Sequence, residues 1–211
     1  MRVVLASNNA KKLTELRSLF ASLPVELVSQ KELGITEAEE PHVTFVENAL
    51  AKARHAARAC GGAAIADDSG LCVDALGGAP GVASAHFAPV EAQAGEREAQ
   101  RALQDAANNR LLLERLRGSP SAGERHASFV STLVALRHAD DPEPLIAFGR
   151  WSGEILFAPR GTGGFGYDPL VFIAALGRSV AELDAEAKNA ISHRALAARE
   201  MVVLMRSRWL R

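Results

Sequence analysis

The chain has 211 residues, of which 48% are hydrophobic and 23% charged, a composition typical of a globular protein large enough to bury a core. Its 24 lysines and arginines nearly balance its 25 acids, so the net charge of −1 excludes a general attraction to nucleic acids or anionic membranes. No apolar run is long enough to span a bilayer or to act as a signal peptide, and we therefore expect a cytoplasmic protein with no membrane partner.

The spacing of apolar residues predicts a mixed α/β protein. Short apolar runs alternate with segments in which apolar residues recur at helical spacing, and turns rich in glycine or proline separate them. The predicted strands are residues 3–6, 25–29, 63–66 with 71–73, 126–137, 145–157 and 170–173. The predicted helices are residues 11–20, 44–60, about 94–117, as one long helix or a pair of helices, and about 189–205. No repeat or flexible linker divides the chain, so any two lobes would have to share strands or exchange helices.

The second predicted helix has the clearest boundaries. Thr44 and Glu47 form a capping-box pattern at its start, and residues 61–62, both glycine, end it. Cys60 and Cys72 are the only cysteines, and their spacing fits neither a redox pair nor a zinc site. We expect both to be buried, reduced thiols.

Two adjacent acids, Asp67 and Asp68, follow the apolar run 63–66, which would place two carboxylates at the end of a buried strand. Like charges that are partly desolvated need a cation, a proton or hydrogen-bond donors to stabilise them. Carboxylates without a nearby cluster of cysteine and histidine suit a hard ion such as Mg²⁺. Because Asp, Ser and Gly also favour turns, residues 67–70 fit a simple turn equally well.

The first loop lies between a predicted strand and the start of a predicted helix, where free backbone N–H groups and the helix dipole favour anions. Its residues are Ser7, Asn8, Asn9, Ala10, Lys11 and Lys12. Ser7 and Asn9 can donate hydrogen bonds, and Lys12 adds a positive charge, so the loop can bind phosphate. Capping of the helix by serine or asparagine explains the same residues, and the chain has no Walker-type loop.

Glu40, just before the second predicted helix, is a candidate to join Asp68 as a metal ligand. Glu37 and Glu39 are equally available, and an exposed loop acid explains Glu40 as well. Lys52, two turns into the helix, can reach back toward phosphates or simply face solvent.

A glycine-rich loop, residues 161–169, carries Phe165 and Tyr167, whose rings can cover a flat ligand while the glycines permit close approach. Tyr167 is the only tyrosine, and a buried hydroxyl would need a partner. The alternative is a connecting loop whose aromatic rings pack into the core, with Asp168 starting a turn.

Near the start of the last predicted helix, Lys188 can neutralise phosphate, while His193 and Arg194 can donate hydrogen bonds to a base. A solvent-exposed basic helix start is the alternative. Cations are disfavoured at that end of a helix dipole, which favours the functional interpretation.

Taken in order, four motifs resemble the inosine triphosphate pyrophosphatase family over nearly the whole chain. They are Ser7-x-Asn9-x-x-Lys12; residues 45–49 leading to Lys52; residues 66–71 with 77–81; and residues 164–169 followed by Lys188 and 191–194. Each motif alone is weak, but the ordered set is specific.

The resemblance implies Mg²⁺-dependent hydrolysis of ITP, dITP and XTP to the monophosphate and pyrophosphate. It also implies a single domain, residues 1–211, with an elongated mixed α/β sheet, flanking helices and two lobes around a central substrate cleft, commonly as a homodimer. By family position Asp68 is the catalytic proton acceptor and, with Glu40, a metal ligand. The implied substrate-binding residues are Ser7, Asn8, Asn9, Ala10, Lys11, Lys12 and Lys188 for the phosphates, Ser69, and Phe165, Gly166, Tyr167, Asp168, His193 and Arg194 around the base. A non-catalytic nucleotide sensor and a diphosphatase for modified pyrimidine nucleotides are the alternatives.

Overall fold

The structure, a computed structural model, describes residues 1–90, 97–119 and 121–210. Its residues form two compact units that share the three longest strands. Unit 1 comprises residues 1–69, 131–150 and 191–211, and unit 2 comprises residues 70–130 and 151–190.

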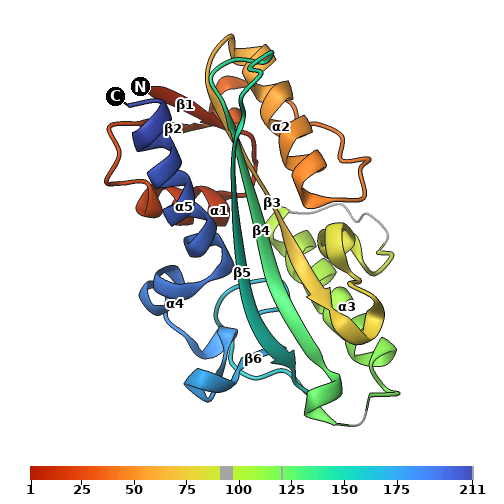
Figure 1. Cartoon of the computed structure of the whole chain (residues 1–211). Helices are drawn as coiled ribbons and strands as arrows, with labels where there is room; N and C mark the ends of the chain where they lie inside the picture. Colours follow the sequence, from red (N-terminus) through yellow and green to blue (C-terminus); the bar gives the residue numbers. More distant parts are fainter. Residues whose placement is uncertain (91–96, 120, 211) are drawn as a thin grey trace. The chain divides into compact units, whose positions relative to one another are not determined.

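The described residues form helices and a single mixed sheet (Figure 1). The helices are α1 (Ala10–Leu19), α2 (Phe45–Cys60), α3 (Arg97–Arg115), α4 (Ala185–Ile191) and α5 (His193–Arg208). The strands are β1 (Arg2–Leu5), β2 (Glu26–Ser29), β3 (Ala64–Val73), β4 (His126–Leu136), β5 (Leu145–Ile155), β6 (Val171–Ile173) and β7 (Arg178–Ser179). The hydrogen-bonded order is β2-β1-β3-β4-β5-β6-β7, in which β1 runs parallel to β2 and β3, and β6 runs antiparallel to β5 and β7. The mixed α/β fold with flanking helices is therefore confirmed.

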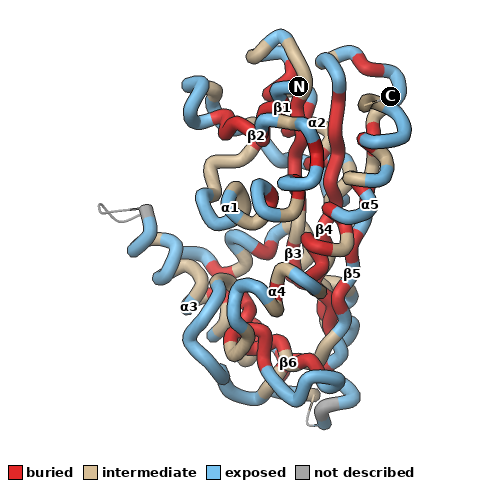
Figure 2. Tube along the Cα trace, turned by 90° about the vertical axis from the view of Figure 1, so that its left-hand side faces the viewer, coloured by how far each residue is buried: buried red, intermediate tan, exposed pale blue. Residues whose placement is uncertain are grey.

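Because successive side chains of a strand alternate between its two faces, the core of unit 1 forms two clusters, one on each face. Val3 and Ile65 belong to the cluster that includes residues of α1 and α5, whereas Val4 and Ala64 belong to the cluster that includes residues of α2. Figure 1 shows α2 on the opposite side of these strands from α1 and α5. Both faces are covered, and Figure 2 shows β4 buried along most of its length. Because successive side chains of a strand point to opposite faces, neighbouring residues of β3 meet different helices.

Helix α2 begins and ends as its sequence predicts. The Thr44 side chain accepts a hydrogen bond from the Glu47 backbone N–H, and Gly61 ends the helix in the left-handed conformation at φ 63°. Cys60 and Cys72 are both reduced thiols, as predicted, but each is only partly buried. Among the described residues, none of the helices has the length and apolar character needed to cross a membrane.

The prediction that the paired aspartates end a strand, or form a turn, is wrong. Strand β3 continues through residues 67–70 to Val73, so both acids lie in its middle. Asp67 and Asp68 have relative exposures of 1% and 6%. Side chains from other elements supply the hydrogen bonds and charges that acids inside a strand require, and they override the low strand propensity of aspartate.

The predicted last helix, residues 189–205, is in fact two helices. Ser192 has an extended conformation (φ −64°, ψ 162°) and its side chain accepts a hydrogen bond from the Ala195 backbone N–H. The serine thus caps α5 and interrupts the helical hydrogen bonds. Lys188 consequently lies in the last turn of α4, where a cation is favoured, so the expected conflict with the helix dipole does not exist for this residue.

In unit 2, α3 begins at Arg97, and residues 94–96 of the predicted helix lie outside the described residues. A buried arginine, Arg125, links the end of this helix to β5. Its guanidinium donates to the carbonyl oxygens of Leu116 at 2.9 Å and Ile155 at 2.8 Å, and it lies 4.4 Å from the centroid of the Phe157 ring. These contacts fix α3 against β5 within unit 2.

Candidate active site

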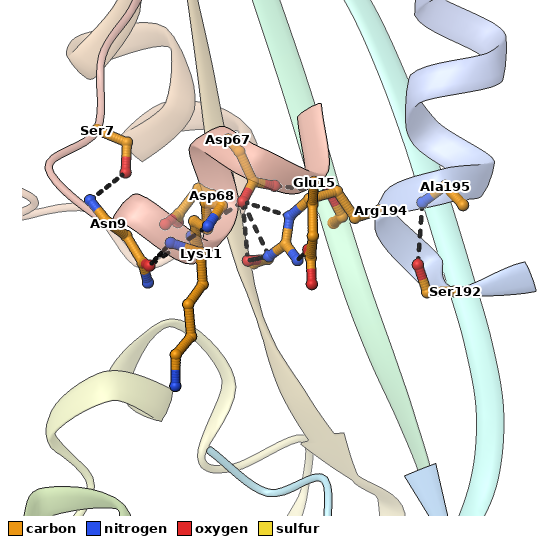
Figure 3. A network of polar contacts seen from close by, with 12 residues as sticks. Ser7, Asn9, Lys11, Glu15, Asp67, Asp68, Ser192, Arg194 and Ala195 are labelled. Carbon is orange, nitrogen blue, oxygen red and sulfur yellow. Dashed lines mark hydrogen bonds and ion pairs between the residues drawn. The ribbon is translucent and has the colours of Figure 1, made fainter. Parts of the chain in front are cut away.

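The Asp67 side chain lies on the face of β3 that packs against α1 and α5. Its Oδ1 accepts a hydrogen bond from Ser131 Oγ at 2.7 Å, and its Oδ2 lies 2.9 Å from Lys12 Nζ and 3.2 Å from Arg194 Nε (Figure 3). Burial alone would raise the pKa of Asp67, but Arg194 and Lys12 outweigh burial and hold the pKa well below its usual range. Asp67 is therefore ionised, and both of its oxygens already have partners within the chain.

Arg194, in the first turn of α5, lies between two acids. Its guanidinium contacts Asp67 through Nε and Glu15 through Nη1, and Nη2 donates to Ser69 Oγ at 3.0 Å (Figure 3). Burial lowers the pKa of Arg194, but Asp67 and Glu15 outweigh that effect and raise it. No motif in the sequence singles out Glu15, although it follows Lys12 by three residues and so lies on the same face of α1.

A glycine in β5 allows α5 to approach the sheet. A Cβ built on Gly149 would lie 1.8 Å from the backbone oxygen of His193 and 2.7 Å from the backbone nitrogen of Ala197. Only a residue without a side chain permits this contact. Gly149 thus helps to place the first turn of α5, which carries the buried side chains of His193 and Arg194.

Asp68 projects to the other face of β3, toward α2. Lys52 Nζ lies 2.8 Å from Asp68 Oδ1 and 3.0 Å from Glu40 Oε2, so one ammonium joins the two predicted metal ligands. Burial raises the pKa of Asp68, Lys52 opposes the rise and Glu40 adds to it, which leaves the pKa above its usual value. Burial would also raise the pKa of Glu40, but Lys52 outweighs it and the pKa is lowered. The neighbouring acids Asp67 and Asp68 thus have opposite pKa shifts.

The residues around Asp68 fit a hard metal ion. Asp68 Oδ2 is buried and has no hydrogen-bond partner within the described residues, an unfavourable state that a cation would relieve. In that same part of the chain, no three or more His, Cys, Asp and Glu side chains form a group able to hold a metal. Asp68 and Glu40 would therefore supply a minority of the ligands, with water and ligand phosphates supplying the rest, as is usual for Mg²⁺.

The first loop is a helix cap, as one of the two interpretations predicted. Asn9 Oδ1 accepts from the backbone N–H groups of Lys11 at 3.0 Å and Lys12 at 3.3 Å, and Ser7 Oγ accepts from the Asn9 N–H at 3.2 Å (Figure 3). Asn8 Oδ1 accepts from the Gln30 side chain at 3.3 Å, and Ala10 is the first residue of α1. The Lys11 side chain points away from Asp67 and Asp68 in Figure 3. Capping does not exclude phosphate binding, which stays a prediction for this loop.

In unit 2, residues 164–168 form a tight turn, here called the Phe165 turn, that contacts Lys188. Asp168 Oδ2 accepts from the Phe165 N–H at 2.9 Å and lies 2.7 Å from Lys188 Nζ. The Lys188 ammonium also lies 4.5 Å from the centroid of the Phe165 ring. Tyr167 is buried and its hydroxyl donates to the Ser84 backbone oxygen at 3.0 Å, which confirms the expected partner. The structure thus brings Phe165, Asp168 and Lys188 together.

Comparisons with known proteins agree with the family predicted from the four motifs. The Ham1 family model matches residues 3–204. The dITP/XTP pyrophosphatase of Methylibium petroleiphilum is 75% identical over 210 residues, which cover 100% of both chains, and that of Leptothrix cholodnii is 66% identical over 212 residues, covering 99% of both. A HAM1 protein from Coxiella burnetii has a solved structure that is 40% identical, with a TM-score of 0.87, and the match covers 98% of this chain and 99% of that one. The chain belongs to the Ham1 family.

Proposed function

We propose that this chain is a nucleoside-triphosphate diphosphatase that hydrolyses the non-standard purine nucleotides ITP, dITP and XTP to the monophosphate and pyrophosphate, thereby cleansing the nucleotide pool. Relatives that match it from end to end carry the name dITP/XTP pyrophosphatase. The observation that carries the proposal is the contrast between two neighbouring acids. Asp67 is ionised with both oxygens bonded, whereas Asp68 has a raised pKa and a buried oxygen without a partner in the described residues.

In this proposal Asp68 accepts the proton of the attacking water. A carboxylate held beside the attacking water can act as a general base, and general bases typically contribute about 10²–10⁴-fold to a rate. Nucleotide pyrophosphatases of this family are generally metal-dependent, and we propose Mg²⁺ bound by Asp68 and Glu40. When bound, Mg²⁺ would neutralise charge on the triphosphate and on the leaving pyrophosphate.

The remaining predicted residues would bind the substrate. We propose that residues 7–12 and Lys188 bind the phosphates, that Ser69 contacts the substrate, and that Phe165, Gly166, Tyr167, Asp168, His193 and Arg194 enclose the base. Hypoxanthine and xanthine carry a carbonyl at C6, where adenine carries an amino group. Donors fixed toward that carbonyl would reject adenine, because a buried donor facing a donor costs about 1–3 kcal/mol. Arg194, held by Asp67 and Glu15, has the fixed orientation that such a donor requires.

A substrate panel tests the function. Purified protein with Mg²⁺ should release pyrophosphate, and no inorganic phosphate, from ITP, dITP and XTP, while ATP, GTP and modified pyrimidine triphosphates react much more slowly. Pyrophosphate and phosphate are measured separately. Tight binding of ITP without product over hours would instead support a nucleotide sensor, and preference for a modified pyrimidine would support the related diphosphatase.

Glu40→Gln is expected to raise the Mg²⁺ concentration for half-maximal activity about tenfold, because the variant removes one of two charged oxygen ligands and keeps the side-chain shape. At saturating Mg²⁺ the kcat should recover to within a few-fold of the unmodified protein. A Mg²⁺ titration of pyrophosphate release measures both quantities. Glu37→Gln is the matched control, since it removes an exposed acid from the same loop. An unchanged Mg²⁺ dependence in Glu40→Gln would exclude Glu40 as a ligand.

We further propose that residues 1–211 act as one catalytic domain, as a homodimer in the cytoplasm, where the nucleotide pool lies. Light scattering on the purified chain tests the dimer, which should have twice the mass of one chain.

A further inference from the structure

Two side chains of α3 form hydrogen bonds to the backbone of the Phe165 turn, and neither belongs to the four motifs. The Gly166 N–H donates to Asp105 Oδ2 at 2.8 Å, and the Gly166 carbonyl accepts from Asn109 Nδ2 at 2.9 Å. Asp105 and Asn109 are four residues apart and therefore lie on one face of the helix. One face of α3 thus holds both backbone hydrogen-bonding groups of a single residue in the turn. All of these residues belong to unit 2.

These two hydrogen bonds hold a backbone conformation that residues other than glycine rarely adopt. Gly166 has φ 61°, in the left-handed region, and Gly164 has φ 74°. Asn109 Oδ1 is buried, and among the residues that the structure describes it has no hydrogen-bond partner. An apolar side chain would avoid that penalty, so packing alone does not explain an asparagine here. Its contribution is the hydrogen bond that it donates to Gly166.

The same helix also supports the turn indirectly. Asn108 Nδ2 donates to the Ser84 carbonyl at 3.2 Å, and that carbonyl accepts the Tyr167 hydroxyl. Asn108 Oδ1 accepts from the Ala88 N–H at 2.8 Å, which holds the segment that carries Ser84. Three polar side chains of α3, at positions 105, 108 and 109, therefore fix Gly166 and the partner of Tyr167.

We propose that Asp105 and Asn109 are positioning residues that set the purine selectivity of the enzyme by holding Gly166. This inference rests on the proposed function, in which the Phe165 turn encloses the base. Discrimination between bases requires polar groups and ring faces to be held in place, because a turn that can shift will accommodate a wrong base at little cost. Neither residue needs to contact the nucleotide, since both act through the Gly166 backbone.

The test compares Asp105→Ala and Asn109→Ala with the unmodified enzyme on dITP, dGTP and dATP. Each variant removes one hydrogen bond to Gly166. We expect kcat/KM for dITP to fall about fivefold to tenfold, mostly because KM rises. The preference for dITP over dGTP, which is the ratio of their kcat/KM values, should fall by a similar factor. Asp105→Asn keeps an oxygen that can accept from the Gly166 N–H and should restore most of the preference. Glu114→Ala removes an exposed acid from the same helix and should leave both quantities unchanged.

The outcomes separate this inference from the function on which it rests. An unmodified protein that releases no pyrophosphate from dITP would contradict the proposed function itself. An active unmodified protein, with folded variants whose preference for dITP over dGTP is unchanged, would overturn only the positioning role. An equal loss for all three nucleotides would also overturn it, because a general structural role predicts that pattern. Circular dichroism establishes folding, and Asn109→Ala carries the test if Asp105→Ala does not fold.

Discussion

Replacing Asp68 with asparagine is expected to lower turnover of dITP about a thousandfold while the protein stays folded. Asparagine has the same shape, and its oxygen can still accept from Lys52, but it cannot take a proton from water. Burial raises the pKa of Asp68, which means that the folded state disfavours the charged form. Removing that charge still leaves the buried Lys52 ammonium paired with Glu40 at 3.0 Å, so the melting temperature should change little.

Two measurements check the Asp68→Asn result: pyrophosphate release from dITP at saturating Mg²⁺, and thermal unfolding. Asp140→Asn is the matched control, because Asp140 is exposed and the same substitution there should alter neither measurement. Turnover above about a tenth of the unmodified rate would remove Asp68 from the role of proton acceptor. A large fall in melting temperature would instead show that Asp68 is needed chiefly for folding.

The different roles of the two aspartates follow from strand geometry that the sequence only partly reveals. The run 63–66 is apolar throughout because both faces of β3 are covered, so no alternation marks which residues face which helix. Adjacent acids also suggest the end of a strand, since aspartate is disfavoured inside one. Once β3 is known to continue to Val73, the period of two assigns Asp67 to the α1 and α5 side and Asp68 to the α2 side.

The contacts of Asp67 with residues far away in the sequence could not be predicted from the sequence alone. Ser131 is 64 residues from Asp67, and Arg194 is 127 residues away. No local pattern in a single sequence pairs such residues, and the same holds for Asp105 with Gly166. Helix α2, by contrast, was predicted correctly because its cap, its apolar face and its terminal glycine are all local signals. The break at Ser192 also has a local signal, a serine cap, but the apolar pattern that continues across it conceals the break.

Asp67→Asn should lower the free energy of unfolding at pH 7 by about 3–5 kcal/mol, because it removes the shared counter-charge of the buried Arg194 and the partly buried Lys12. Arg194 would keep Glu15, whereas Lys12 would lose the acid that lies 2.9 Å from its ammonium. For a chain of this length the melting temperature should fall by about 10 °C. Urea denaturation measures the free energy directly, and Asp74→Asn, at an exposed acid, is the control that should change it little.

The effect of Asp67→Asn should also depend on pH, in a direction set by the lowered pKa of Asp67. The folded-state pKa lies below that of the unfolded chain, so ionised Asp67 stabilises the fold above about pH 4 and this contribution is lost as pH falls toward the folded pKa. Asparagine lacks the contribution at every pH. The difference in unfolding free energy between the two proteins should therefore narrow by about 1 kcal/mol from pH 5 to pH 3. A difference that stays constant over that range would mean that the charge of Asp67 is not the source of its stabilising effect, and that the loss of the acceptor oxygen facing Lys12 and Arg194, where asparagine can place an amide donor, supplies it instead.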